Sequence, residues 1–81
     1  MKVKLLAFGI ARDIVGGSEI NIELSENQYV VSDLKNKLLS EFPDFEKLAS
    51  LRVAVNAEYV DDNFVLNPND EVVLIPPVSG G

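Results

Sequence analysis

The chain has 81 residues, of which 47% are hydrophobic and 25% charged, and its formal net charge is −6. This length allows one domain with one core, and the composition is that of a folded globular protein. The chain has no cysteine and no histidine. These absences exclude disulfides, thiolate metal sites and a cysteine nucleophile, and they remove the most common general base. We therefore expect no self-contained active site, no metal site and no permanently bound cofactor.

The charge and the apolar pattern also limit the possible partners. Nucleic acid phosphates would repel a chain this acidic, so we expect no nucleic acid partner; a basic protein surface would attract it. No apolar run approaches the roughly 18 residues of a membrane span, and the N-terminus does not resemble a signal peptide. We therefore expect a cytoplasmic protein without membrane contact.

Two strands are predicted at the start of the chain. Val3–Phe8 is apolar and begins by alternating, and Glu19–Leu24 alternates strictly between apolar and polar side chains. The intervening segment 9–18 contains three glycines and predicts a loop or a short turn. The two strands are therefore expected to form a hairpin with a long connection.

The segment that begins at Val31 predicts the one clear helix. Ser32 is placed to cap its first turn, and Asp33 lies near the positive end of the helix dipole. Pro43 ends the helix because the residue before a proline avoids the α region, and one further turn is expected within residues 44–49. The predicted apolar stripe consists of Leu34, Leu38, Leu39 and Phe42.

The rest of the chain is predicted to be β structure. Leu51–Asn56 alternates, Ala57–Glu58 forms a turn before a short strand around Tyr59–Val60, and Glu71–Ile75 is the last strand. This order of elements predicts an α+β fold in which the helix lies across one face of a mixed sheet. With the first and last strands parallel at the centre, it is the β-grasp, or ubiquitin-like, architecture. We expect a single domain over residues 1–81, with 76–81 as an extended C-terminal tail.

Strand alternation also predicts an apolar surface on the sheet face opposite the helix, called here the outer face. It directs Leu6, Phe8, Val73 and Ile75 to that face. An exposed apolar group of this size indicates a contact surface for a partner, which Tyr59 could join from the short strand. The alternative is that three loop residues fold over it as a second small core. These are Ile10, Ile14 and Val15.

The chain closes on a proline pair, two small or medium side chains and two glycines. Pro76 and Pro77 end the strand ladder and favour an extended path. The four residues that follow, Val78 to Gly81, reach about 13–14 Å when fully extended. Gly80 and Gly81 could enter a channel too narrow for other residues, unless the two glycines are accidental or mark a truncation. The Gly81 carboxylate could then be activated as an adenylate and converted to a thiocarboxylate, a thioester or an amide.

The whole chain resembles the small, sulfur-carrying subunits of molybdopterin synthases, in the segments LLAFGIARD, VAVN and NPNDEVVLIPPVSGG. The resemblance implies that an ATP-dependent activating enzyme joins AMP transiently to Gly81 and that a sulfur donor protein then yields the thiocarboxylate. It further implies that the tail, residues 76–81, enters the active site of a large catalytic subunit and gives sulfur to cyclic pyranopterin monophosphate. The implied partner contacts are Phe8, Tyr59 and Ile75, the last at a position where family members often carry an aromatic residue.

Two other functions stay open on the sequence alone. One is sulfur carriage for the thiamine thiazole, and the other is protein modification through an isopeptide bond of Gly81. Among the remaining charged groups, Asp61–Asp62 is expected to be a solvated turn and not a cation site. Lys2, Lys4 and Arg52 are expected to form a small basic spot without a chemical role.

Overall fold

The computed structural model describes residues 1–47 and 51–76. Its elements in chain order are β1 (Lys2–Ala7), α1 (Gly9–Val15), β2 (Glu19–Glu23), α2 (Val31–Glu41), the 3₁₀ helix η1 (Pro43–Lys47), β3 (Arg52–Val55), β4 (Glu58–Val60) and β5 (Val72–Ile75). The strands form one sheet in the order β2-β1-β5-β3-β4. The predicted α+β class, with a mixed sheet, is confirmed.

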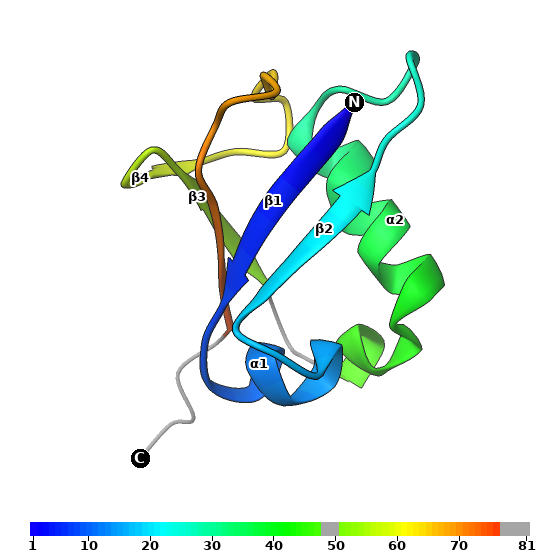
Figure 1. Ribbon diagram of the computed structural model, residues 1–81, viewed down its shortest axis with the longest axis vertical. Helices are drawn as coiled ribbons and strands as arrows, with labels where there is room; N and C mark the ends of the chain where they lie inside the picture. Colours follow the sequence, from blue (N-terminus) through cyan, green and yellow to red (C-terminus); the bar gives the residue numbers. More distant parts are fainter. Residues whose placement is uncertain (48–50, 77–81) are drawn as a thin grey trace.

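The two central strands of the sheet are its first and its last in the sequence. β1 and β5 run parallel, with Leu6 opposite Val73, and every other neighbouring pair of strands is antiparallel. Both central strands therefore run toward the end of the sheet where α1 lies (Figure 1). This places the end of β5, where the C-terminal segment begins, beside the end of β1.

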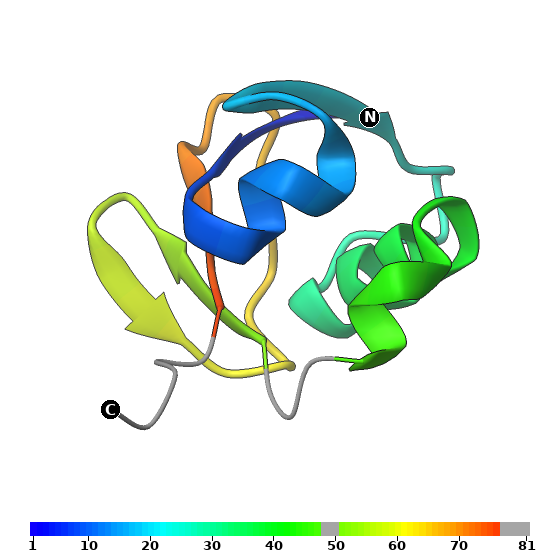
Figure 2. The ribbon, with the colours of Figure 1, turned by 90° about the horizontal axis from the view of Figure 1, so that it is seen from below.

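The helices lie on one side of the curved sheet and enclose the core (Figure 2). Alternation along the central strands is as predicted: Val3, Leu5 and Ala7 are buried, as are Val72 and Leu74. From α2, Leu34 and Leu38 are fully buried, whereas Leu39 is 40% exposed. The predicted stripe was thus too wide, because Leu38 and Leu39 are 100° apart on a helix and only one of them can face the sheet directly.

Segment 9–15 is a helix, although the sequence predicted a loop there. α1 buries Ala11, and Ile14 and Val15 pack against the main core. It ends at Gly16, which has a left-handed φ of 82° and donates its N–H to the carbonyl of Arg12 at 2.9 Å. A left-handed glycine of this kind is the usual stop for a helix, so the glycines that suggested a loop in fact end a short helix.

The start of α2 also differs from the prediction. The cap position is Val30, and Asp33 accepts hydrogen bonds from the backbone N–H groups of Tyr29 and Val30 at 3.0 and 3.1 Å. Ser32 is inside the first turn, and its backbone N–H donates to the carbonyl of Asp62 at 3.0 Å. The free N–H groups of the first turn are therefore satisfied from a distant loop, which a local sequence pattern does not show.

The turn between β3 and β4 lies one residue earlier than predicted, at Asn56–Ala57. Both residues have positive φ, 51° and 72°, the combination required by the tight hairpin turn that matches strand twist. The Asn56 side chain donates to Asp70 at 2.9 Å and accepts from the backbone N–H of Glu71 at 3.0 Å. This turn therefore also holds the chain immediately before β5.

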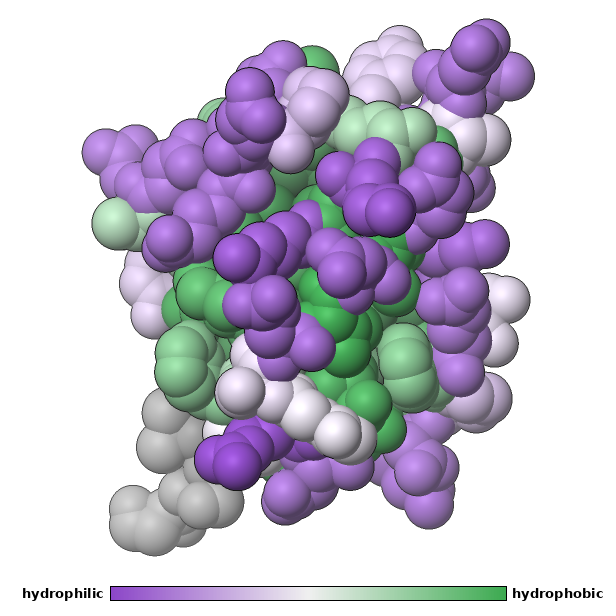
Figure 3. Space-filling model, viewed as in Figure 1, coloured by the Kyte–Doolittle hydropathy of each residue, from purple (hydrophilic) through white to green (hydrophobic). Residues whose placement is uncertain are grey.

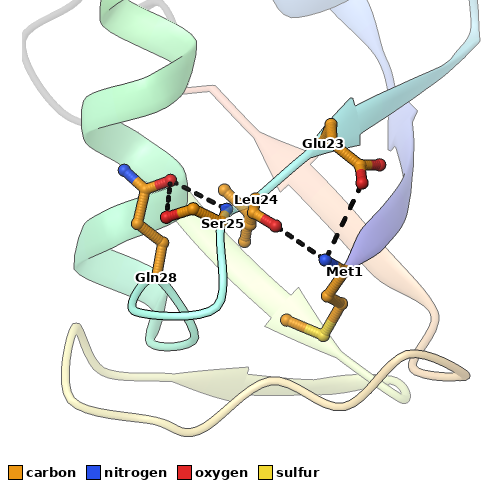
Figure 4. Close-up of polar contacts among 5 residues, drawn as sticks. All are labelled: Met1, Glu23, Leu24, Ser25 and Gln28. Atoms are coloured by element: carbon orange, nitrogen blue, oxygen red, sulfur yellow. Dashed lines mark hydrogen bonds and ion pairs between the residues drawn. The ribbon is translucent and has the colours of Figure 1, made fainter.

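At the end of the sheet away from α1, the first residue is tied to the chain that follows β2 (Figure 4). The Met1 ammonium donates to the carbonyl of Leu24 at 2.6 Å and lies 3.9 Å from a carboxylate oxygen of Glu23. Gln28 accepts from both the backbone N–H and the hydroxyl of Ser25, at 3.1 and 3.0 Å. Within residues 1–47 and 51–76, no helix is long and apolar enough to cross a membrane.

Candidate functional site

The outer face carries a continuous row of side chains across four strands. Leu6 on β1 is opposite Val73 on β5, Val73 is opposite Ala54 on β3, and Ala54 is opposite Tyr59 on β4. Alternation puts all four on the side away from the core. Leu6 and Val73 are half-buried and Tyr59 is 60% exposed, so the row presents apolar surface to solvent.

A second group lies where the central strands end. Phe8, one residue beyond β1, is 57% exposed, and Ile75 at the end of β5 is half-buried and opposite Arg52. Apolar surface appears between charged side chains over the middle and lower part of the space-filling view (Figure 3). The outer-face placement of Leu6, Phe8, Val73 and Ile75 thus agrees with the alternation argument.

The expected alternative, a second small core over this face, does not form from α1. Ile14 and Val15 pack against the main core, and Ile10 is 49% exposed. Their helix lies on the same side of the sheet as α2 (Figure 2). Among residues 1–47 and 51–76, Phe8 and Tyr59 are therefore exposed and Leu6 and Val73 half-exposed.

Pro76 continues the outer face to the last described residue. It is half-buried, and a Cβ added at Gly9 would lie 3.7 Å from the Pro76 Cγ atom. Gly9 itself has a φ of +55°, which a side chain would strain. The beginning of the C-terminal segment is therefore packed beside the Phe8–Gly9 turn. Pro77, Val78, Ser79, Gly80 and Gly81 lie outside the described residues.

Two outer-face residues were not given a role on the sequence. Ala54 is only 7% exposed. Arg52 stacks on Tyr59, with its guanidinium carbon 4.6 Å from the ring centroid. The alternation of Leu51–Asn56 could have found both, since it puts Arg52 and Ala54 together on one side of this strand. The sequence predicted that Arg52 forms a basic spot with Lys2 and Lys4. In the structure its guanidinium instead contacts Tyr59 of the apolar row.

The border of the outer face is polar. A pocket of about 230 Å³ beside Leu6 is lined by Lys4, Asn69, Asp70 and Glu71. Lys4 pairs with Glu19 at 3.4 Å. Farther away, Asp62 pairs with Lys35 at 2.8 Å and Asp61 accepts from the backbone of Asn63, so these acids form a hydrogen-bonded surface turn. An apolar centre with a charged rim is the usual anatomy of a protein interface.

The profile of the ThiS family matches residues 5–81. The chain belongs to the ThiS family. The molybdopterin synthase sulfur carrier subunit of Dictyostelium discoideum is 35% identical over 81 residues, covering 96% of this chain and 94% of the relative. A Pyrococcus furiosus structure described as molybdopterin converting factor subunit 1 matches with a TM-score of 0.85 at 31% identity, covering 96% of this chain and 99% of that one.

Two further structures widen the comparison of this ThiS family member. One chain in a structure of the complex of subunits 1 and 2 of the molybdopterin-converting factor from Helicobacter pylori matches at 26% identity with a TM-score of 0.67. The match covers all of this chain and all of that one. SAMP1 from Haloferax volcanii matches with a TM-score of 0.81 over all of both chains, but at 21% identity this likeness concerns the fold alone. These neighbours share the ubiquitin-like β-grasp fold, and that prediction is confirmed.

Proposed function

We propose that this protein is the sulfur carrier of a molybdopterin synthase. The observation that carries the proposal is that an apolar surface and the C-terminal segment lie next to each other at one end of β5. The apolar outer face meets the start of the PPVSGG segment at Ile75 and Pro76, in a chain of the ThiS family. Similarity over nearly the full length to sulfur carrier subunits of molybdopterin synthases supports the choice of pathway.

The reacting group is the carboxylate of Gly81. Its oxygen attacks the α-phosphorus of ATP and pyrophosphate leaves, which gives an acyl-adenylate on an ATP-dependent activating enzyme. The terminal sulfur of a persulfide on the donor protein then displaces AMP. A thiol cleaves the S–S bond of the resulting acyl disulfide, which leaves the thiocarboxylate on Gly81 and a disulfide on the donor side. The chain contains no cysteine that could hold this sulfur elsewhere. We place these steps in the cytoplasm, where the activating enzyme finds ATP.

The loaded carrier then binds the large catalytic subunit through its outer face. Phe8, Tyr59 and Ile75 make the apolar contact, with Leu6 and Val73 beside them. Five residues follow Pro76 and span up to about 17 Å when extended, enough to bring Gly81 into a buried active site. There the thiocarboxylate sulfur displaces an oxygen substituent from a carbon of cyclic pyranopterin monophosphate. Water then hydrolyses the resulting thioester, which leaves the sulfur on the substrate and returns Gly81 to a carboxylate. Acid–base groups come from the large subunit, since this chain has no histidine.

The terminal chemistry is tested by intact mass spectrometry of the protein purified from cells that make molybdopterin. A fraction whose mass has increased by one oxygen-to-sulfur exchange, located at Gly81 by fragmentation, is the expected result. Deleting Gly81, or adding one residue after it, should abolish molybdopterin formation while far-UV circular dichroism is unchanged. An extended chain that still supports synthesis without being trimmed would refute the mechanism.

Two further observations, the proteins found joined to or purified with the carrier and the phenotype of its loss, separate the two alternatives. A protein modifier would appear joined through Gly81 to lysines of many cellular proteins, whereas a synthase subunit should co-purify with one large subunit. A carrier for the thiamine thiazole would also hold a thiocarboxylate. Its loss, however, would cause a requirement for thiamine and leave molybdopterin synthesis intact.

A further inference from the structure

Arg52 is a cation on the outer face, at the end of the sheet from which the C-terminal segment leaves. It begins β3, is opposite Ile75 in the strand register and lies over the ring of Tyr59 at 4.6 Å. Both of these neighbours belong to the proposed contact with the large subunit. A partner that covers Ile75 and Tyr59 therefore also covers the guanidinium.

The guanidinium has no acidic partner within residues 1–47 and 51–76. In these ranges its side chain makes no ion pair and no hydrogen bond, although the whole chain carries 13 acidic residues. Among the other cations of these ranges, Lys4, Lys35, Lys37 and Lys47 each pair with a carboxylate, whereas Lys2 and Arg12 do not.

Stacking also prepares this side chain for a planar ligand. The contact with Tyr59 restrains the guanidinium and leaves its edge, where the N–H donors lie, free to bind. Covering an unpaired charge with apolar surface is costly, and a bidentate carboxylate compensates this cost best. We propose that Arg52 is a specificity-determining residue, which receives a carboxylate side chain of the large subunit between Tyr59 and Ile75.

This inference rests on the proposed function and assigns Arg52 to a protein carboxylate, not to the substrate phosphate. Under that function the substrate meets Gly81, six residues beyond Ile75 in the sequence. Arg52 lies at the other end of this segment, beside Ile75. A negative group that reaches Arg52 while the outer face is covered therefore comes from the partner's surface.

The test compares charge-neutral and charge-reversed variants at one position. The probe is the large molybdopterin synthase subunit from the same organism, and Kd is measured by calorimetry for the unmutated chain, Arg52→Lys, Arg52→Met and Arg52→Glu. Methionine keeps the apolar stem without the charge. We expect Arg52→Met to weaken binding by about thirtyfold and Arg52→Glu by at least about tenfold more, as for a buried charge pair; Arg52→Lys should lose less than Arg52→Met.

Lys47→Glu is the matched control, because it makes the same charge reversal at an exposed residue of η1, in the helix layer. It should change Kd by less than about twofold, since screening removes interactions beyond about 8 Å. Circular dichroism verifies that each variant is folded. If Arg52→Glu bound as well as Arg52→Met, no partner carboxylate would face Arg52 and the inference would be wrong. If the unmutated chain did not bind at all, the proposed function would fail first.

Discussion

Truncation of Phe8 to alanine separates the outer face from the fold. The Phe8 side chain is 57% exposed, whereas its carbonyl accepts hydrogen bonds from the N–H groups of Ala11 and Arg12 at 3.1 and 3.3 Å. Phe8→Ala leaves both backbone bonds in place and so preserves the start of α1. We therefore expect weaker binding to the large subunit with a folded, stable carrier.

The size of the effect follows from the exposed area. A phenylalanine side chain presents about 200 Å², so the 57% still exposed in the free protein is about 110 Å². At about 25 cal/mol per Å², complete burial of that area contributes at most about 3 kcal/mol. The alanine side chain still buries a small part of this area on binding. The expected loss of binding free energy is therefore about 1–3 kcal/mol, or about fivefold to 150-fold in Kd.

Calorimetry with the large subunit measures this loss, and Tyr29→Ala supplies the control. Tyr29 is 50% exposed and, like Phe8, uses its backbone for hydrogen bonds, to Asp33 and to Leu66. It precedes α2 and is not on β1, β5 or the β3–β4 pair. An unchanged Kd for Phe8→Ala, or an equal loss for Tyr29→Ala, would show that the outer face is not the binding surface.

Three predictions concern the fold, and the free energy of unfolding in urea measures each of them. Asp33→Ala removes the acceptor of two backbone N–H groups and should cost about 1 kcal/mol. Ser32 is the cap that the sequence alone predicts, but Ser32→Ala should cost less than about 0.5 kcal/mol. Leu38→Ala should cost about 3 kcal/mol because Leu38 is fully buried. Leu39 is 40% exposed, so an equal loss of stability for Leu39→Ala would contradict the observed packing. Ala57→Gly should gain about 0.5–1 kcal/mol and raise Tm by a few degrees, because glycine tolerates the φ of 72°; a lower Tm would mean that the turn is not strained.

The β part of the fold was predictable because it depends on alternation. Side chains two residues apart in Val3–Ala7 and Val72–Leu74 face the same way, so one correctly placed residue orients the whole strand. The same rule found the outer-face residues Leu6 and Phe8. It also implies that Arg52 and Ala54 share one side of β3, although alternation alone does not show that Arg52 stacks on Tyr59.

The helical details were not predictable because they depend on distant contacts. α1 has 7 residues, too few for a helix that is stable alone, so its formation depends on the burial of Ala11 against the core. Likewise α2 starts at Val31 because the carbonyls of Phe64 and Asp62 accept its first N–H groups. A serine near a helix start predicts a cap only when no other part of the chain supplies one.

The parallel pairing of β1 with β5 explains how this chain could serve a reaction whose proposed catalytic groups lie on another subunit. Parallel strands end at the same edge of a sheet, so Phe8 and Pro76 leave the sheet together, and the turn at Gly9 packs beside Pro76. The binding surface and the origin of the C-terminal segment therefore have a fixed relative position. With antiparallel pairing they would lie at opposite ends of the strands, and docking would not position the reacting group. In the proposed mechanism this protein contributes position and sulfur, and the large subunit contributes the catalytic groups.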